Sequence, residues 1–537
     1  MPVIKLNNAY LEQLTKTNIR TIRETLPMIG SEIEREMADR TDVQFFPNRP
    51  DLYSVEGTAR AIRGYLGIET GLPTYEVKPS GISFKTDPKL ADIRPYLGSA
   101  VIRNVHMDDV MIESLMGLQE SLHWTIGRER KKVAIGVHDL DKIEGPFSYI
   151  ATERTTAFIP LDYTVPLTME KILEEHPKGK AYAKIVEDLP LFPLIHDVNG
   201  KICSFPPIIN SELTRVTKET RNILLDVTGT EPRAVSIAVN ILCTAMAEIG
   251  ATIEAVNING SETPTLAPMR RTVSVAACNA LIGMRLSAEE MKTLLERMRF
   301  GVEILDAEHV RVLIPCYRAD IMHDHDIYED VAIAYGYDKI PPKLPSTFTI
   351  GKPHPVQEIY KLVREIMTGL SYIENTPFTL TNEKVAYGMM NRQNNPAALH
   401  VLHPISEDQT IIRTEILPLL MESLSINQSH ELPQRIFACG DVIENLVMYP
   451  KMAAVAIHTT ADFSEVYAVV DAFCRMMALS YEVQESEDPA FIDGRRGDIY
   501  FNGKKIGVFG EISPNVLTAF NLEHSVIAFE INLSYLL

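Results

Sequence analysis

The chain has 537 residues, 45% hydrophobic and 23% charged, so it can form several globular domains and is too apolar to be a disordered polypeptide. Its formal net charge of −19 at pH 7 excludes binding of nucleic acid by bulk charge attraction, so any RNA contact needs a local basic patch or a basic partner. The six cysteines form no Cys-x-x-Cys pair, which is typical of a protein of the reducing cytoplasm.

The first part of the chain contains a predicted joint and a predicted strand. The opening residues, MPVIKLNNAYLEQL, lack the basic and then apolar pattern of a secretory signal. Glycine and proline cluster over residues 71–81, where we expect a first folded segment to end. The run RERKK at 128–132 is a candidate basic patch, and a solvated loop or helix end explains it equally well. The following VAIGVHDL, residues 133–140, is rich in the β-branched residues of strands.

Residues 189–230 combine apolar segments with small polar side chains. LPLFPLI begins this stretch, and ILLDVTGT ends it as a predicted strand. Successive side chains of a strand alternate between its faces, so Asp226 and Thr228 are expected on one face. Further hydroxyl and amide groups belong to Ser204, Asn210, Ser211 and Thr214. The stretch therefore predicts a pocket with apolar walls and a few polar groups, without a recognisable Ser-His-Asp or Cys-His arrangement.

The most apolar long run of the chain covers residues 234–253. Its apolar residues recur at helical spacing, and Asn240 and Glu248 interrupt it. A buried helix is therefore predicted, and a membrane span is not. The prolines of SETPTLAP, residues 261–268, separate this helix from the next folded region.

That next region begins with a predicted amphipathic helix, SAEEMKTLLERMRF, over residues 287–300. Ser287 is a good N-cap, and Glu290 three residues later completes a capping box. HVRVLIP at 309–315 is predicted to be a strand. The proline-rich stretch at 340–355 is the clearest predicted linker of the chain.

Between that strand and the linker lies DIMHDHDIYEDVAIAYGYDKI, residues 320–340, which holds six carboxylates in twenty-one residues. We expect a helix that begins near Asp324 or Asp326 and ends at Tyr335, with Gly336 as its C-cap. Like charges one turn apart on a helix repel each other. A binding partner for these carboxylates is therefore expected.

A divalent cation is one such partner. Asp326, Glu329 and Asp330 share a helix face, and Asp320 can fold back onto it. Four carboxylates that converge suit Mg²⁺ or Ca²⁺. The alternative needs no metal, because acidic residues also favour a helix N-terminus through the macrodipole, and the segment would then be a capped, solvated helix. The residues by themselves leave both interpretations open.

Long motifs in a fixed order point to a known family. YRADIMHDHDIYEDVAIAYGYDKIP, residues 317–341, resembles the hallmark of phenylalanyl-tRNA synthetase β subunits. Further segments resemble that family in the expected order: FPNRPDLYSVEGTARAIRGYLG (46–67), RKKVAIGVHDLDKI (130–143), HPKGKAYAKIV (176–186), FPPIINSELTRVTKETRNILLDVTGT (205–230), HPISEDQTIIRTEILPLLMESLSIN (403–427) and IGVFGEISPNVLTAFNLE (506–523). The chain length and the second of these motifs resemble the archaeal and eukaryotic type, without the anticodon-binding domain of the bacterial chain.

The resemblance implies an α+β multidomain fold with four parts. We expect an N-terminal α+β root domain over residues 1–108 and an α+β editing domain over 109–265. A winged-helix-like domain with the acidic metal cluster would follow at 266–345. Residues 346–537 would form a class II synthetase-like antiparallel sheet with helices. This last module is expected to be catalytically inactive, because GRRGDIYFNGKK (494–505) lacks the Gly-x-Gly-x-x-x-Arg pattern of ATP-binding relatives.

The resemblance also implies an activity, partners and a location. The chain would be the β half of a cytoplasmic α₂β₂ phenylalanine–tRNA ligase that uses ATP and Mg²⁺, binds tRNA(Phe) and does not associate with membranes. Its α subunit would hold the synthetic active site. By position in the motif, Asp320, Asp326, Glu329 and Asp330 would bind an Mg²⁺ shared with the α subunit.

In this family the β chain hydrolyses mischarged Tyr-tRNA(Phe), because an apolar synthetic pocket rejects an added hydroxyl only by about 10²-fold. The resemblance places the editing pocket at Leu194, Ser204, Asp226 and Thr228, with Ile195 and Ser211 as alternatives for the leucine and the serine. We expect a positioned water to attack the ester, with Asp226 as its orienter or weak base.

Two other functions remain as alternatives. In the first, the chain is a scaffold and tRNA-binding subunit of the same complex whose editing pocket has decayed. In the second, it is a free-standing metal-dependent hydrolase built on the acidic cluster. No nucleophile, base or apolar pocket lies near that cluster in the sequence, so the second is the weaker alternative.

Overall fold

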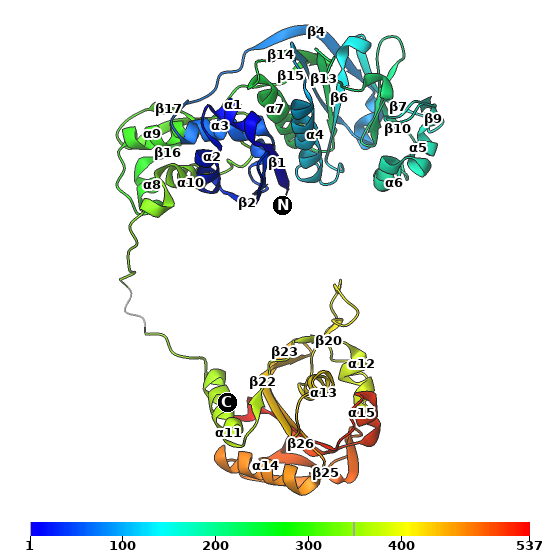
Figure 1. The fold of residues 1–537 in the computed structure, drawn as a ribbon, viewed down its shortest axis with the longest axis vertical. Coiled ribbons are helices and arrows are strands. Elements are labelled where there is room, and N and C mark those ends of the chain that lie inside the picture. Colours follow the sequence, from blue (N-terminus) through cyan, green and yellow to red (C-terminus); the bar gives the residue numbers. More distant parts are fainter. Residues whose placement is uncertain (1, 347–349, 537) are drawn as a thin grey trace. The chain divides into compact units, whose positions relative to one another are not determined.

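The computed structural model describes residues 2–346 and 350–536. It consists of two compact units, Met1–Leu344 and Pro345–Leu537, each built of helices and strands (Figure 1). This confirms the predicted α+β multidomain class. The boundary between the units along the chain falls inside the predicted linker 340–355, whose residues 347–349 lie outside the described part of the chain.

The first unit begins with a small antiparallel sheet of order β1-β3-β2. Its bounds are Val3–Asn7 for β1, Ser31–Glu36 for β2 and Arg40–Phe45 for β3. Three helices accompany it, α1 (Asn8–Thr15), α2 (Ile19–Thr25) and α3 (Val55–Tyr65). Nearly all of α3 is buried, including the charged side chains of Arg60 and Arg63, so these charges need partners inside the protein.

A sheet of ten strands follows, in the order β12-β11-β10-β7-β4-β14-β5-β13-β6, with β15 paired to β14. Its strands are β4 (Val77–Thr86), β5 (Tyr96–Arg103), β6 (Val133–Asp139), β7 (Phe147–Thr152), β10 (Phe192–His196), β11 (Ile202–Phe205), β12 (Ile209–Asn210), β13 (Ile223–Gly229), β14 (Thr252–Ile258) and β15 (Ser261–Thr263). The end strands β6 and β12 lie side by side, and Asn210 Nδ2 donates to the Val137 carbonyl across 3.3 Å. The sheet is therefore curled into a nearly closed barrel.

Two long helices cover this sheet, α4 (Asp109–Trp124) and α7 (Pro232–Ala247). Helix α7 confirms the buried helix expected within residues 234–253, although it ends at Ala247 before Gly250, whose φ of 85° suits a glycine turn. Among the described residues, no helix is long and apolar enough to cross a membrane. Strands β4 and β5, which we assigned to the segment 1–108, pair with β14 and β13 of the next segment.

The last part of the first unit is a three-stranded antiparallel sheet of order β16-β18-β17, with three helices. Its elements are β16 (Met269–Ser274), β17 (Gly301–Ile304), β18 (His309–Ile314), α8 (Val275–Ile282), α9 (Ala288–Arg297) and α10 (Asp324–Tyr335). The predicted capping box of Ser287 and Glu290 is present at the start of α9. Helix α10 begins at Asp324 and has Gly336 as its C-cap, as predicted.

The second unit is built on a seven-stranded sheet of order β19-β22-β23-β27-β26-β25-β24, antiparallel except where β19 meets β22. The strands are β19 (Ile373–Glu374), β22 (Gln434–Glu444), β23 (Val447–Ile457), β24 (Tyr481–Glu485), β25 (Phe491–Phe501), β26 (Lys504–Ile512) and β27 (Val526–Asn532). Helices α11 (Pro355–Gly369) and α14 (Phe463–Met476) belong to one apolar core, and α13 (Leu417–Ile426) to another. Because alternate residues of β22, β23 and β27 enter the two cores, the sheet is covered on both faces.

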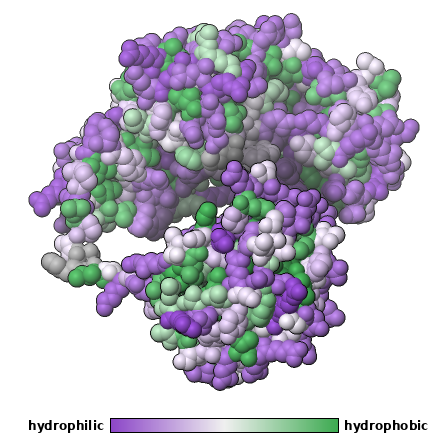
Figure 2. Space-filling model, turned by 60° about the horizontal axis from the view of Figure 1, so that its bottom comes forward, coloured by the Kyte–Doolittle hydropathy of each residue, from purple (hydrophilic) through white to green (hydrophobic). Residues whose placement is uncertain are grey.

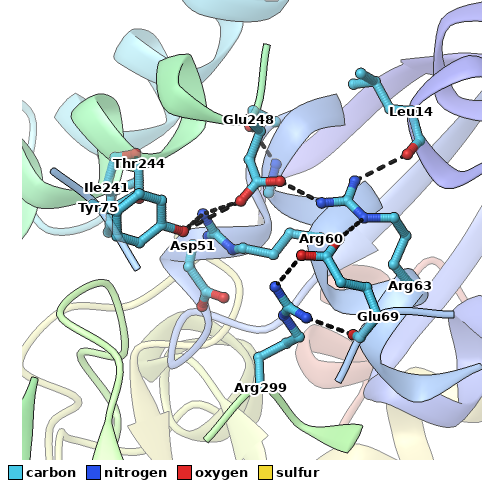
Figure 3. A network of polar contacts seen from close by, with 12 residues as sticks. Leu14, Asp51, Arg60, Arg63, Glu69, Tyr75, Ile241, Thr244, Glu248 and Arg299 are labelled. Carbon is cyan, nitrogen blue, oxygen red and sulfur yellow. Dashed lines mark hydrogen bonds and ion pairs between the residues drawn. The ribbon is translucent and has the colours of Figure 1, made fainter. Parts of the chain in front are cut away.

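A network of charged side chains, most of them buried, joins the three parts of the first unit (Figure 3). Glu248, at the end of α7, receives hydrogen bonds from Arg63 and from Tyr75, and lies 3.6 Å from Arg60. Arg63 also donates to Glu69, and Arg299 donates to the other oxygen of that carboxylate. The network thus connects α3, the ten-stranded sheet domain and the turn after α9.

Replacing Glu248 by Gln should destabilise the first unit. The change removes the negative charge that faces the buried guanidinium groups of Arg60 and Arg63 and leaves them one neutral acceptor oxygen. We expect the free energy of unfolding to fall by about 3 kcal/mol. Equilibrium urea unfolding of the full chain measures this. Glu76→Gln is the matched control, because the Glu76 side chain is 80% exposed, and it should change stability by less than about 0.5 kcal/mol. Equal effects of the two variants would contradict the prediction.

Candidate functional site

A cavity of about 360 Å³ lies where the end strands of the ten-stranded sheet meet. Its walls are largely apolar and come from α4, β6 and the turn between β11 and β12: Ile112, Met116, Ile135, Val137, Phe205, Ile208 and Ile209. Polar side chains line it as well: Gln119, Glu120, His123, Arg130, Asp162, His176, Lys178, Ser204, Asn210, Thr214, Arg215 and Asp226. Apolar walls with a few fixed polar groups are typical of small-molecule sites.

The most buried charged side chain of the cavity is that of Asp226. Asp226 lies on β13 opposite Gly136 of β6, and its Oδ2 accepts a hydrogen bond from Ser204 Oγ at 2.9 Å. His138 Nε2 lies 2.6 Å from the same oxygen, and His138 Nδ1 lies 2.8 Å from Thr214 Oγ1. His138 and Asp226 are 0% and 2% exposed, so water does not screen these contacts.

This arrangement presents an acceptor to the cavity and does not activate a nucleophile. Both side-chain contacts of Asp226 go to Oδ2, and no other described group donates to Oδ1. Oδ1 is therefore available to a hydroxyl in the cavity. In a Ser-His-Asp triad the histidine lies between serine and aspartate, whereas here the aspartate lies between Ser204 and His138. His138 therefore does not contact the Ser204 hydroxyl as a base would.

The remaining predicted pocket residues lie outside the cavity lining. Thr228 Oγ1 accepts a hydrogen bond from Arg94 Nε at 2.9 Å, and burial lowers the pKa of Arg94 to about 10. Leu194 packs in the apolar cluster behind the cavity wall. Ser211 Oγ accepts from the Leu213 amide and donates to the Ile159 carbonyl, which is a turn role. The structure thus brings together Ser204 and Asp226 and places these three residues around them.

One residue of the predicted basic patch turns inward. Arg128, Glu129 and Arg130 all have positive φ, at 46°, 55° and 67°, which is unusual for residues other than glycine. Arg128 is exposed, but Arg130 is buried in the cavity wall and donates to the Ile208 carbonyl at 2.8 Å. Arg130 Nε has no hydrogen-bond partner among the described residues. The left-handed turn therefore directs the Arg130 side chain into the cavity wall, with its Nε buried there.

Glu120 and His123 on α4 order the rim of the cavity. The Glu120 carboxylate contacts Arg130 and Lys178, and it lies 3.4 Å from His123 Nδ1. His123 Nε2 accepts from the Ile135 amide at 2.7 Å, which ties α4 to β6. Burial lowers the pKa of His123 to about 4, against the opposing pull of Glu120. The imidazole is therefore neutral at pH 7 and can act as this acceptor.

The acidic stretch does not form the predicted four-ligand site within this chain. Buried Arg318 donates to both oxygens of Asp320, at 2.9 and 2.6 Å, and to Asp330 at 2.5 Å. Burial raises the pKa of Asp330 to about 6. Burial would also raise the pKa of Asp320, but the Arg318 charge outweighs it and holds that pKa below its ordinary value. The positive partner that the sequence required for these two acids is an arginine.

The other two acids of the cluster point elsewhere. Asp326 Oδ2 accepts the Met322 and His323 amides, at 2.7 and 2.6 Å, as the capping residue of α10. Glu329 is exposed. Within the described ranges, no group of three or more His, Cys, Asp or Glu side chains could hold a metal ion. The four acids of this chain therefore do not surround a single metal ion. Asp326 has the helix-capping role that the metal-free alternative predicted.

Comparisons with known proteins agree with this architecture. The profile described as "Phenylalanyl tRNA synthetase beta chain CLM domain" matches residues 340–533, "tRNA synthetase B5 domain" matches 271–337, and "B3/4 domain" matches 110–244. The phenylalanine–tRNA ligase β subunit of Methanocorpusculum labreanum is 73% identical over 533 residues, which cover 99% of each chain. The chain belongs to the phenylalanine–tRNA ligase β-subunit family.

Further relatives of this family support the assignment. The β subunit of Methanospirillum hungatei is 53% identical, over 100% of this chain and 98% of its own length. A crystal structure of an N-terminal fragment of the phenylalanyl-tRNA synthetase β subunit from Pyrococcus horikoshii matches with 40% sequence identity and a TM-score of 0.60. The match covers 62% of this chain and 99% of the fragment. The resemblance of the motifs to this family is thus confirmed, and the cavity lies among the residues matched as the B3/4 domain.

Sequence reasoning missed His138 and Arg130 as residues of the site. His138 is two residues from Gly136 on the predicted strand 133–140, so the two share a face, and this signal was available. The pairing that brings His138 against Asp226 was not, because it depends on which strands are neighbours and in which register.

Lowering the pH from 7 to 5 should destabilise the chain through His123. The pKa of His123 is about 4 in the folded chain, against 6.5 ordinarily. Below pH 6.5 the unfolded chain therefore binds a proton that the folded chain does not, and the free energy of unfolding decreases as the pH is lowered. We expect the wild type to lose about 2 kcal/mol more than His123→Gln, whose amide oxygen can still accept the Ile135 N–H. Urea unfolding at both pH values measures this, and equal losses would show that His123 does not titrate as described.

Proposed function

We propose that the cavity hydrolyses tyrosine from mischarged Tyr-tRNA(Phe). The observation that carries this proposal is a buried carboxylate, Asp226, at an apolar cavity large enough for an aromatic side chain. Membership of the β-subunit family makes an aminoacyl-tRNA the expected substrate. The apolar walls would bind the ring of either tyrosine or phenylalanine.

Selection between these two amino acids would come from the hydroxyl. Tyrosine can donate its phenolic hydrogen to Asp226 Oδ1, whereas phenylalanine would leave a buried carboxylate oxygen without a partner. A site built to bind a hydroxyl rejects the analogue that lacks it by about 10⁴–10⁵-fold. This is the reverse of the problem in a synthetic site, where an apolar pocket cannot exclude tyrosine strongly.

The hydrolytic step would use water. Ser204 is held by Asp226 and has no base, so a covalent intermediate is not part of the proposal. Asp226 would act in recognition through its hydrogen bond to the substrate hydroxyl, which replaces the role of weak base that we expected from the sequence.

The proposal includes partners and a location. We infer an α₂β₂ assembly in the cytoplasm in which the α subunit performs ATP-dependent synthesis and tRNA(Phe) binds both chains. Residues 346–537 would be the class II-like module without synthetic activity. This unit exposes several large apolar side chains, Phe378, Leu402, Ile405 and Leu446, and contact with the α subunit would bury such groups. On the face shown in Figure 2, hydrophilic residues cover much of each unit and apolar residues form smaller patches.

We propose that this chain contributes fewer ligands to Mg²⁺ than the four that the sequence predicted. Arg318 already binds Asp320 and Asp330, and Asp326 caps a helix, so Glu329 is the acid of the cluster that can contribute a ligand. Mg²⁺ in proteins often takes only one or two carboxylates and keeps several waters. The α subunit and water would supply the other ligands.

Replacing Asp226 by Asn should abolish discrimination in the α/β complex. We expect the ratio of Tyr-tRNA(Phe) to Phe-tRNA(Phe) hydrolysis rates to fall by at least about 100-fold, because the charged acceptor for the hydroxyl is lost. Asp197→Asn is the control, since Asp197 is a buried turn aspartate outside the cavity. Absence of hydrolysis by the wild type, with Phe-tRNA(Phe) synthesis intact, would favour the scaffold alternative.

Replacing Glu329 by Gln should weaken Mg²⁺ binding to the α/β complex by at least about tenfold. Isothermal titration calorimetry measures the binding, with Glu303→Gln as a control at another exposed acid of the same domain. Binding unchanged by Glu329→Gln would remove Glu329 from the metal site.

A further inference from the structure

We infer that His138 is a positioning residue that sets the rejection of phenylalanine by the cavity, because it fixes the orientation of the Asp226 carboxylate. The inference rests on the proposed hydrolysis of Tyr-tRNA(Phe). His138 does not line the cavity, so it does not touch the substrate and acts through Asp226.

The contacts of His138 determine its hydrogen-bond pattern. A carboxylate can only accept, so Nε2 carries the hydrogen that Asp226 Oδ2 receives across 2.6 Å. Nδ1 lies 2.8 Å from the hydroxyl of Thr214, which itself lies within 3.2 Å of the Ser211 carbonyl. The ring is therefore held at both nitrogens, by a strand on one side and by a turn on the other.

A second observation is the space reserved for this pair. Gly136 faces Asp226 across the β6–β13 ladder, and a Cβ at position 136 would lie 2.4 Å from Asp226 Oδ2 and 2.6 Å from His138 Nε2. Both distances are shorter than real Cβ contacts, so any side chain there would push the pair apart. Gly136 has no left-handed backbone that would require glycine, so close approach is the reason for it.

The consequence for specificity follows from the freedom of an aspartate side chain. With His138 and Ser204 both on Oδ2, the carboxylate plane is fixed and Oδ1 is directed to one place for a hydroxyl. Without His138 only Ser204 would restrain Oδ2. The carboxylate could then turn to another donor, and phenylalanine would no longer leave a buried oxygen unpaired. Loss of His138 should therefore raise hydrolysis of Phe-tRNA(Phe) relative to Tyr-tRNA(Phe).

The experiment compares three variants of His138 in the reconstituted α/β complex. The amide nitrogen of Gln reaches the place of Nε2, whereas that of Asn reaches only the place of Nδ1, so His138→Gln keeps the donor to Asp226 and His138→Asn keeps only the Thr214 contact. The measurement is kcat/KM for hydrolysis of Tyr-tRNA(Phe) and of Phe-tRNA(Phe), with the melting temperature of each variant. His196→Leu, a histidine of β10 outside the cavity lining, is the control.

We expect His138→Asn and His138→Leu to lower the Tyr/Phe ratio of kcat/KM by at least about tenfold, and His138→Gln to stay near the wild type. Gly136→Ala should act in the same direction, which tests the pair without changing either member. An unchanged ratio in His138→Leu, or equal ratios in the Asn and Gln variants, would overturn the inference and leave the proposed function standing. A wild type that hydrolyses neither substrate would overturn both.

Discussion

The cavity of this β-subunit relative exists because the ten-stranded sheet closes on itself. Strands β13 and β6 are buried along their whole lengths, so both of their faces must be covered. The sheet achieves this by curling until β12 reaches β6, where Asn210 donates to Val137. Ser204, Asp226 and part of the apolar wall come from strands at or next to this junction, and helix α4 supplies the rest of the wall. A flatter sheet would keep the same residues and leave no enclosed space between them.

A second constraint is the burial of charge, and the chain satisfies it with arginine. Arg60 and Arg63 meet Glu248 inside the first unit, and Arg318 binds two acids of the α10 region. Arginine suits this role because its guanidinium stays charged and can donate to two carboxylates at once. In an acidic chain of net charge −19, such pairs allow charged side chains to link separate sheets without an unpaired charge in the interior.

Recognition in the cavity also depends on which partners a buried carboxylate has. Asp226 is buried as deeply as Asp330, yet its partners are the imidazole of His138 and the hydroxyl of Ser204, which contact only one of its oxygens. The structural acids are neutralised by arginines, whereas this carboxylate keeps an oxygen for a ligand. That difference separates a binding group from a fold-stabilising group more clearly than burial does.

The sequence by itself determined the family through its long motifs. It also determined the α+β class and many local elements, because caps and periodic apolar positions are encoded within a few residues. The capping box of Ser287, the bounds of α10 and the pairing of Ser204 and Asp226 in one pocket were all predictable. Only the tertiary structure decided that Thr228 turns to Arg94, that Arg318 takes the acids expected to bind magnesium, and that His138 holds Asp226. Each of these contacts joins side chains whose partner depends on strand order, register or the folding back of a loop, and local sequence patterns do not encode those choices.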